Sequence, residues 1–330
     1  MALRIHNLSI DPPLALAPMV GLTHSVFRSL LVELGGVGLL YSEMLSAKRL
    51  PAENADLTPG LIRSSLEFPL FYQIWANEDT DLVAAVRKIE ELNGQGIDLN
   101  LGCPAPQLRK MGAGRYLLER PDRLMPVLRR IRTSTTLPLS VKIRIGPTAD
   151  PAALLLTCRM LEEQGVDLIV VHARLAGEKF CRKPRWQLLD VLPQRLSIPF
   201  FANGGIFTVQ DARDCLTLSG ADGLMIGRGA VQWPWLISAI ARDIYGHKSP
   251  LAYSSPEQLY FTYIDLLMAR FPPERRLGRL KQFTHHFAAS LPFGHSLAST
   301  IQSSGSMKEA RTRAAVFFEQ SDNQSLTEEV

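Results

Sequence analysis

Short apolar segments rich in branched residues recur along the first three quarters of the chain. Their spacing of roughly 25 to 30 residues accommodates one strand and one helix per unit. The eight segments are 14–20, 38–44, 68–75, 96–103, 137–146, 166–174, 198–206 and 221–229.

Amphipathic stretches lie between these segments. Residues 79–92 place apolar side chains at helical spacing, and residues 150–164 and 209–218 do the same. Gly35, Gly165 and Gly220 stand where helices should end. Eight strand–helix units predict an α/β fold, a (β/α)8 TIM barrel closing near residue 244. A doubly wound sheet shows the same alternation, but the count of eight and the polar residues at the strand ends favour the barrel.

The character of the sequence changes at about residue 246. Residues 246–257, GHKSPLAYSSPE, are typical of a linker. Helix-like stretches follow at 257–271, 275–290 and 306–318, with no strand between them. We therefore expect a catalytic barrel domain over residues 1–245 and a small all-helical domain over residues 246–330.

Composition adds modest constraints. The 330 residues carry a formal net charge of +4 with a pI near 8.9, which is compatible with a nucleic-acid partner without requiring one. The four cysteines form no CxxC pair, so we expect no metal site. No apolar run approaches the roughly 20 residues that span a bilayer, so we expect a cytoplasmic protein without a membrane partner.

Chemically useful residues stand at the C-terminal ends of the predicted strands, which is where barrels bind ligands. These candidates are Pro18, Met19, Val20, Glu43, Gln73, Asn100, Cys103, Lys142, Arg144, His172, Arg174, Asn203, Gly204, Gly205, Gly227 and Arg228.

Glycines mark the last two predicted strands. Asn203-Gly204-Gly205 and Gly227-Arg228 fall where barrels often hold a phosphate, and glycine lets backbone N–H groups approach one closely. Either group alone would be explained by a tight turn. Together they favour a phosphate-bearing cofactor.

Lys142 lies in the otherwise apolar strand SVKIRIG. A lysine facing the barrel interior is costly unless it meets an anion, and reduced flavin carries such a charge. The alternative is that Lys142 points outward, but Arg144 two residues on shares its face and favours the interior. The same two interpretations apply to His172 and Gln73. Each side chain either contacts a ligand or lies in the core with its polar groups hydrogen-bonded to the protein.

Cys103 follows the fourth strand and precedes Pro104, in a loop that contains Gly112-Ala113-Gly114. An unperturbed thiol is mainly protonated at pH 7, so it can donate a proton as well as attack.

Several motifs together resemble the tRNA-dihydrouridine synthases. They are Ala17-Pro18-Met19, the Asn100-Leu101-Gly102-Cys103-Pro104 signature, Lys110-Met111-Gly112-Ala113-Gly114, the strand 140–146, and segments 203–206 and 225–230. Residues 279–283 and the helices around them resemble the C-type bacterial branch. The resemblance runs from about residue 14 to residue 228 and is looser beyond.

The resemblance implies a barrel that binds FMN, takes NADPH as reductant and reduces specific uridines of tRNA. It implies that Cys103 is the general acid and that Asn100, Arg144 and Arg174 contact the substrate. The implied flavin contacts are Pro18, Met19, Val20, Gln73, Lys142, His172, Asn203, Gly204, Gly205, Gly227 and Arg228. The helical domain would bind RNA through Arg275, Arg276, Arg279 and Lys281, near Arg270, and we expect a monomer.

One segment departs from the family pattern. His172-Ala173-Arg174-Leu175 replaces the usual His-Gly-Arg-Thr, and the loop 176–186 is unusually basic. The alternatives are therefore dihydrouridine synthesis on another structured RNA, or an FMN barrel acting on a small substrate, as dihydroorotate dehydrogenases do. A non-enzymatic RNA-binding protein with a vestigial flavin site is disfavoured by the intact Cys103, Lys142 and His172.

Overall fold

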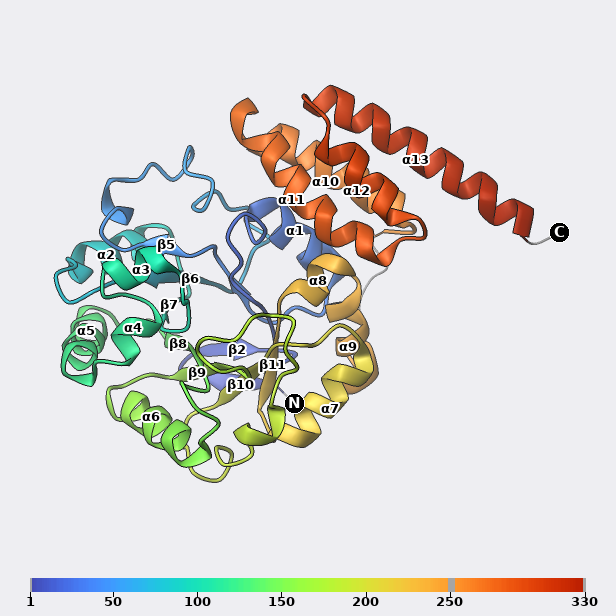
Figure 1. Cartoon of the computed structure of the whole chain (residues 1–330). Coiled ribbons are helices and arrows are strands. Elements are labelled where there is room, and N and C mark those ends of the chain that lie inside the picture. Colours follow the sequence, from blue (N-terminus) through green and yellow to red (C-terminus); the bar gives the residue numbers. More distant parts are fainter. Residues whose placement is uncertain (1, 249–252, 329–330) are drawn as a thin grey trace.

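The computed structural model describes residues 2–248 and 253–328, with side chains described as far as residue 320. Its central element is a parallel barrel in the strand order β3-β11-β10-β9-β8-β7-β6-β4 (Figure 1). A parallel bridge between Ala15 and Leu39 joins the two ends of this order and closes the barrel. The strands are β3 (Leu14–Leu16), β4 (Leu40–Tyr41), β6 (Leu70–Trp75), β7 (Gly96–Asn100), β8 (Leu139–Arg144), β9 (Leu168–His172), β10 (Phe200–Asn203) and β11 (Gly223–Ile226). The barrel prediction is confirmed, and the doubly wound sheet is excluded.

The prediction of one continuous strand at 38–44 is wrong in detail. The chain forms two short strands there, β4 and β5 (Leu45–Ser46), and both pair with β6. Between them the Ser42 N–H still donates to the Phe71 carbonyl at 2.9 Å, but the Gln73 N–H donates to the Ser42 hydroxyl at 3.0 Å instead of to a strand carbonyl. The Glu43 carboxylate then accepts a hydrogen bond from the Gly21 backbone N–H. A polar residue that turns inward to a loop thus interrupts the strand.

Strict alternation along the strands separates two hydrophobic cores. Inside the barrel lie Ala15, Tyr41, Phe71, Val170, Phe201 and Met225. An antiparallel hairpin of β1 (Leu3–Ile5) and β2 (Leu8–Ile10) adds Ile5 and Ile10 to this interior core. The sequence did not predict the hairpin, because three-residue strands are too short for alternation to be recognised.

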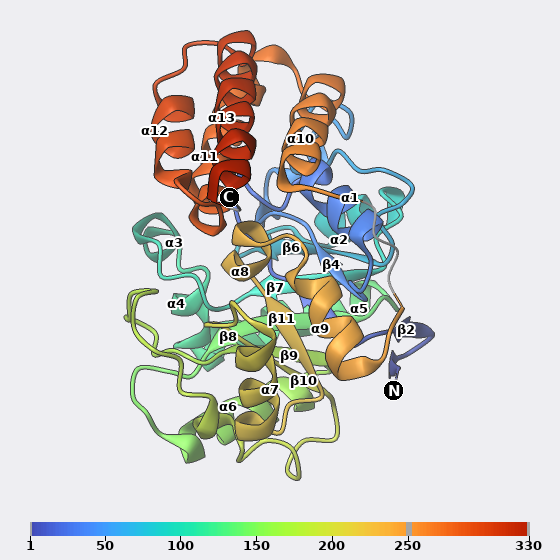
Figure 2. The same ribbon diagram turned by 90° about the vertical axis from the view of Figure 1, so that its right-hand side faces the viewer.

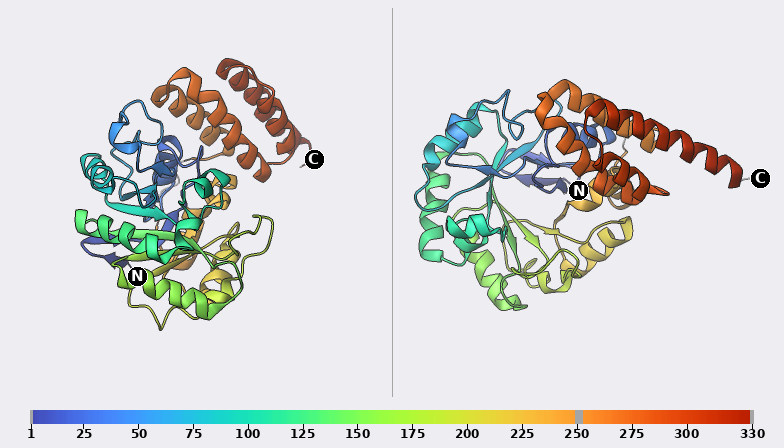
Figure 3. Two further views of the ribbon diagram at one scale, coloured as in Figure 1. Left: turned by 60° about the vertical axis from the view of Figure 1, so that its left-hand side comes forward. Right: turned by 45° about the horizontal axis from the view of Figure 1, so that its top comes forward.

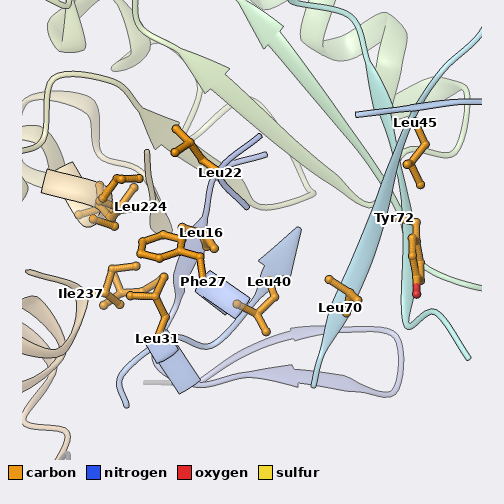
Figure 4. Packing of buried hydrophobic residues seen from close by; sticks show 14 of the residues in the cluster. Leu16, Leu22, Phe27, Leu31, Leu40, Leu45, Leu70, Tyr72, Leu224 and Ile237 are labelled. Carbon is orange, nitrogen blue, oxygen red and sulfur yellow. The ribbon is translucent and has the colours of Figure 1, made fainter. Parts of the chain in front are cut away.

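The other core lies between the strands and the surrounding helices. Figure 4 shows Leu16 and Leu224 of the barrel packed near Phe27, Leu31 and Ile237 of the helical layer. The longer helices of this layer are α1 (Ser25–Leu34), α2 (Leu82–Glu91), α5 (Pro121–Ser134), α6 (Pro151–Glu163), α7 (Val209–Ser219) and α9 (Leu236–Tyr245). Shorter turns are η1 (Leu50–Ala52), α3 (Pro106–Lys110), α4 (Arg115–Leu118), η2 (Trp186–Leu189) and α8 (Arg228–Gln232).

Local signals in the sequence explain where these helices begin and end. The Asp81 and Asp150 carboxylates accept N-terminal backbone N–H groups of α2 and α6, and Thr208 forms a capping box with Asp211. Gly220 ends α7 at a φ of 63°, in the left-handed region that favours glycine.

The C-terminal helices pack beside one flank of the barrel (Figures 2 and 3). They are α10 (Pro256–Arg270), α11 (Arg276–Phe287), α12 (Gly294–Gln302) and α13 (Met307–Glu328), with η3 (Pro273–Arg275) and η4 (Ala288–Ser290) between them. Helix α12 was not predicted, and α13 runs further than the predicted 306–318. Stacked rings fill the centre, with the Tyr263 and Phe283 centroids 3.9 Å apart.

The helical domain and the barrel share a continuous core. Phe27 of α1 lies 5.9 Å from Phe283 of α11, measured between ring centroids. The predicted boundary at residue 245 coincides with the end of α9, while residues 249–252 of the predicted linker lie outside the described residues.

A buried ion pair strengthens this junction. Arg28 and Glu67 are both fully buried, and Arg28 Nε donates to Glu67 at 2.7 Å. Arg270 of α10 donates to the Ser25 and Ser29 hydroxyls of α1 at 2.8 and 2.7 Å. The Arg270 guanidinium therefore holds α10 against α1, and its part in the predicted RNA-binding cluster stays a prediction.

Candidate active site

A cavity of about 520 Å³ opens at the C-terminal ends of the barrel strands. Its volume falls within the range usual for cofactor and ligand sites. The structure brings together in its wall every residue predicted for the catalytic, cofactor and substrate roles. These are Pro18, Met19, Val20, Gln73, Asn100, Cys103, Lys142, Arg144, His172, Arg174, Asn203, Gly204, Gly205, Gly227 and Arg228.

A chain of hydrogen bonds leads from the barrel interior to Cys103. The Gln73 amide donates to the Asp98 carboxylate at 2.7 Å and accepts from the Asn100 amide at 3.0 Å. The Asn100 oxygen in turn accepts the Cys103 backbone N–H at 3.0 Å. The thiol thus stands half-buried on a backbone that two buried amides orient.

Asp98 is the member of this chain that the sequence analysis missed. It is fully buried and also accepts from the Ser140 hydroxyl at 2.6 Å. Burial raises the pKa of its carboxyl to about 6, against the lowering effect of these hydrogen bonds and of Lys142. The sequence could have predicted this position, because Asp98 precedes Asn100 by two residues and so shares the inward face of β7.

Lys142 points into the barrel, as its pairing with Asn203 shows. Its ammonium donates to the Asn203 side-chain oxygen at 2.8 Å, and the Asn203 amide donates to the Met225 carbonyl at 2.7 Å. Burial lowers the pKa of Lys142 to about 8, although Asp98 and Cys103 oppose the shift. A cation held this way is poised to meet an anionic ligand.

His172 lies at the end of β9 beside Arg174. The Arg174 guanidinium lies 2.9 Å from His172 Nε2, and because a guanidinium can only donate, this nitrogen accepts. Burial, followed by the charges of Lys142 and Arg144, lowers the pKa of His172 well below its usual value. His172 is therefore neutral at pH 7 with its proton on Nδ1.

The part of the cavity wall beside His172 is built from glycine backbone. Gly204 and Gly205 have φ of 107° and 77°, and a side chain on Gly204 would overlap the His172 imidazole. Gly227 and Arg228 follow β11 on the adjacent strand. This part offers backbone N–H groups and a guanidinium, which is the donor set a phosphate requires.

Three arginines at the strand ends hold the loop that departs from the family pattern. Arg144 donates to the carbonyls of Leu175 and Glu178 at 3.0 and 2.9 Å. Arg174 donates to the Arg182 carbonyl at 2.6 Å, and Arg228 to the Phe180 carbonyl at 3.2 Å. We call residues 175–182 the strap. The groups that accept these hydrogen bonds are neutral carbonyls, while the Glu178 carboxylate of the strap acts electrostatically on Arg144 and Arg174.

Phe180 is the part of the strap that enters the site. Its ring lines the cavity, stacks on His172 with centroids 5.8 Å apart, and has the Arg228 guanidinium 4.9 Å from its centre. An aromatic ring in a basic loop is hard to assign from sequence, because its direction depends on the fold of the loop.

The family model described as Dihydrouridine synthase matches residues 15–326. The chain belongs to the dihydrouridine synthase family. It is 31% identical to a probable tRNA-dihydrouridine synthase of Rhodobacter capsulatus, over 78% of this chain and 79% of that protein. It is 32% identical to a tRNA-dihydrouridine(16) synthase of Pseudomonas putida, over 84% of this chain and 89% of the relative.

The basic residues predicted to bind RNA lie on η3 and α11 of this dihydrouridine synthase. Arg275 is exposed, and Lys281 is partly exposed. Arg276 donates to the Phe271 carbonyl at 2.6 Å, and Arg279 lies over the Phe271 ring at 4.9 Å. Two of the four are thus engaged with the protein itself, and their role in RNA binding stays a prediction.

The helical domain of this family member also reaches the cavity. His286 of α11 is among the lining residues, although it belongs to the C-terminal helices. Among the described residues, no group of three or more His, Cys, Asp or Glu could hold a metal ion. Likewise, none of the described helices is both long enough and apolar enough to cross a membrane.

Proposed function

We propose that this protein reduces the C5–C6 double bond of uridines in tRNA to give dihydrouridine. The observation that carries the proposal is the half-buried Cys103 thiol, held at the cavity by the Asp98–Gln73–Asn100 chain in a dihydrouridine synthase family member. Relatives at about 30% identity bear the name tRNA-dihydrouridine synthase.

The cavity suits FMN. The partly buried cation Lys142 and the amide of Gln73 can meet the polar edge of a flavin ring, and the glycine backbone near Arg228 can hold its phosphate. Pro18, Met19 and Val20 supply the wall beside Gly227. When bound, the flavin provides the hydride that adds to C6 of uracil, and NADPH restores it.

Cys103 supplies the other half of the reduction. As hydride reaches C6, the electron pair of the double bond localises at C5, and the S–H bond breaks to deliver its proton there. The thiolate left behind lies close enough to Lys142 and Arg144 to interact electrostatically with both. Solvent then returns the proton to sulfur, which balances the cycle.

The substrate must be an extruded base, because a cavity at a barrel mouth cannot accept a stacked one. Asn100 retains one amide N–H beyond its bond to Gln73, and this group can meet the uracil edge. The exposed basic residues of η3 and α11, with Lys179, Lys183 and Arg182 of the strap region, would contact phosphates. We propose that the enzyme works as a cytoplasmic monomer.

The decisive experiment maps dihydrouridine in RNA from cells with and without this gene. Loss of the modification at a defined tRNA position supports the proposal. Loss from another RNA class alone would favour the alternative substrate. No change in any RNA, with flavin turnover on a small pyrimidine instead, would favour a small-molecule reductase.

A Cys103→Ala variant tests the proton donor. It should bind FMN normally but lose at least about 100-fold in dihydrouridine formation, since general acid catalysis contributes on that order. The product is measured on purified tRNA. Cys181→Ser, which alters an exposed cysteine outside the cavity lining, is the matched control. Normal turnover by Cys103→Ala would contradict the role.

A further inference from the structure

The turn at Val20 and Gly21 lies between the cavity and the helical domain. Pro18, Met19 and Val20 follow β3 and line the cavity, and Val20 is 62% exposed. Gly21 has a φ of 80°, a conformation that few other residues adopt. Hydrogen bonds from the Leu22 and Thr23 N–H groups to the Met19 carbonyl, and from the Met19 N–H to the Thr23 hydroxyl, close the turn locally. They leave the Val20 carbonyl and the Gly21 N–H to partners outside the turn.

Two side chains hold this turn from opposite sides. The buried Glu43 carboxylate accepts the Gly21 N–H from within the barrel. Gln282 of α11 donates its amide N–H to the Val20 carbonyl at 2.9 Å. A side chain at residue 21 would overlap the Gln282 amide, so this amide packs directly against the turn.

Helix α11 meets the same cavity at a second place. His286 lies one helical turn beyond Gln282 on the same face and lines the cavity wall. Helix α11 also packs on α8, the helix that begins at Arg228 (Figure 2). The position of α11 therefore determines the position of this part of the cavity wall.

Helix α11 also carries three of the four basic residues proposed to meet RNA, namely Arg276, Arg279 and Lys281. Lys281 precedes Gln282 directly, and the charge of Arg279 acts on Glu43, whose pKa burial raises and Arg279 lowers. Lys281, which is proposed to contact phosphate, and Gln282, which bonds the Val20 carbonyl, are thus consecutive residues of one helix.

We propose that Gln282 is a positioning residue that couples RNA docking on α11 to the geometry of the 18–21 turn. The inference rests on the proposed function, because the coupled ligand is the RNA that carries the uridine. Its hydrogen bond fixes the part of the cavity wall proposed to line the flavin, and the position of the flavin in turn sets where the extruded base must lie. A small misplacement there slows the reaction without weakening RNA binding.

The test compares Gln282→Met, which keeps the length and removes the donor, with Gln282→Lys, which restores a donor. Gln282→Met holoenzyme should reoxidise its reduced flavin about tenfold more slowly at saturating tRNA, with an unchanged Kd for tRNA. Gln282→Lys should recover most of that rate. In the ligand-free protein, amide hydrogen exchange over residues 18–24 should rise in Gln282→Met alone.

Gln302→Met serves as the control, because Gln302 is an exposed glutamine of the same domain that lies outside the cavity lining. It should match the wild-type protein in all three measurements. A Gln282→Met enzyme with the wild-type reoxidation rate, or with a loss of tRNA affinity alone, would overturn the proposal. If the wild-type enzyme forms no dihydrouridine, the proposed function fails, while the exchange measurement still decides whether Gln282 holds the turn.

Discussion

Lys142 shows how one partly buried side chain can couple the site to pH. Its folded-state pKa of about 8 lies below the value of an unfolded lysine. Between about pH 8 and pH 10.5 the unfolded chain therefore binds more protons at this residue than the folded chain does. Raising the pH through this window removes a buried charge and favours folding.

We expect the free energy of unfolding of the flavin-free wild-type protein, measured relative to that of Lys142→Met, to rise with pH across that window. Burial raises the pKa of Cys158, Cys215 and several tyrosines, which lowers stability over the same range, but these groups act equally in both proteins and cancel in the difference. Urea unfolding at a series of pH values measures the effect, and Lys48→Met, at an exposed lysine, is the control. Parallel curves for the wild-type and Lys142→Met proteins would show that this lysine is not buried as described.

At the scale of an element, the strap is held by several hydrogen bonds along its length rather than by any one contact. Arg144, Arg174 and Arg228 donate hydrogen bonds to its carbonyls. The Glu178 carboxylate accepts a hydrogen bond from each of the two terminal nitrogens of Arg185, both at 2.6 Å. The hydrogen bonds from Arg185 lower the pKa of Glu178 to about 2. A loop rich in cleavable lysine and arginine is thus kept in one conformation.

Glu178→Ala should loosen the strap without unfolding the barrel. Limited trypsin digestion of the variant should cut after Lys179 or Arg182 several-fold faster than in the wild-type protein. The initial rate, read by mass spectrometry, is the measurement. Glu163→Ala, at an exposed helical position, should leave the rate unchanged. Equal rates for Glu178→Ala and wild type would mean that the arginines alone hold the strap.

At the scale of the whole molecule, barrel and helices share one core. Phe27 packs against Phe283, and the buried Arg28–Glu67 pair is continued by Arg270. The barrel and the C-terminal helices cannot separate without exposing apolar surface and a buried charge to solvent. The chain should therefore unfold in a single transition.

We predict coincident unfolding midpoints for the two parts. Tryptophan fluorescence reports the barrel, since Trp75, Trp186, Trp233 and Trp235 all precede residue 246. Hydrogen exchange of α12 reports the helical domain. Phe27→Ala should lower both midpoints together, by about 3–5 kcal/mol in stability. Two separated midpoints would contradict a shared core.

The sequence predicted the parts that follow from periodicity and strand ends. The alternation of β6 to β10 sends Gln73, Asn100, Lys142, His172 and Asn203 inward, and all five line one cavity. Asp98 obeys the same alternation but was missed, because attention to strand ends leaves out residues one layer deeper.

Other features depend on tertiary contacts that no local pattern encodes. Arg270 is basic and near other basic residues, yet it binds Ser25 and Ser29, which are distant in sequence. Arg144, Arg174 and Arg228 donate to backbone carbonyls of the strap. Every loop contains such carbonyls, so the sequence does not show which loop these arginines bind. Gln282 gave no signal, because its partner is a backbone carbonyl of residue 20.

The shared core also limits how this protein can exchange parts with its relatives. A chimera joined at residue 245 would place foreign helices against Phe27, His24 and Arg28, which were selected for other neighbours. Helix α1 belongs to the barrel by connectivity but to the helical domain by packing. Recombination that preserves folding should therefore transfer α1 and the segment around Glu67 together with the C-terminal helices, so that the inherited unit is discontinuous in sequence.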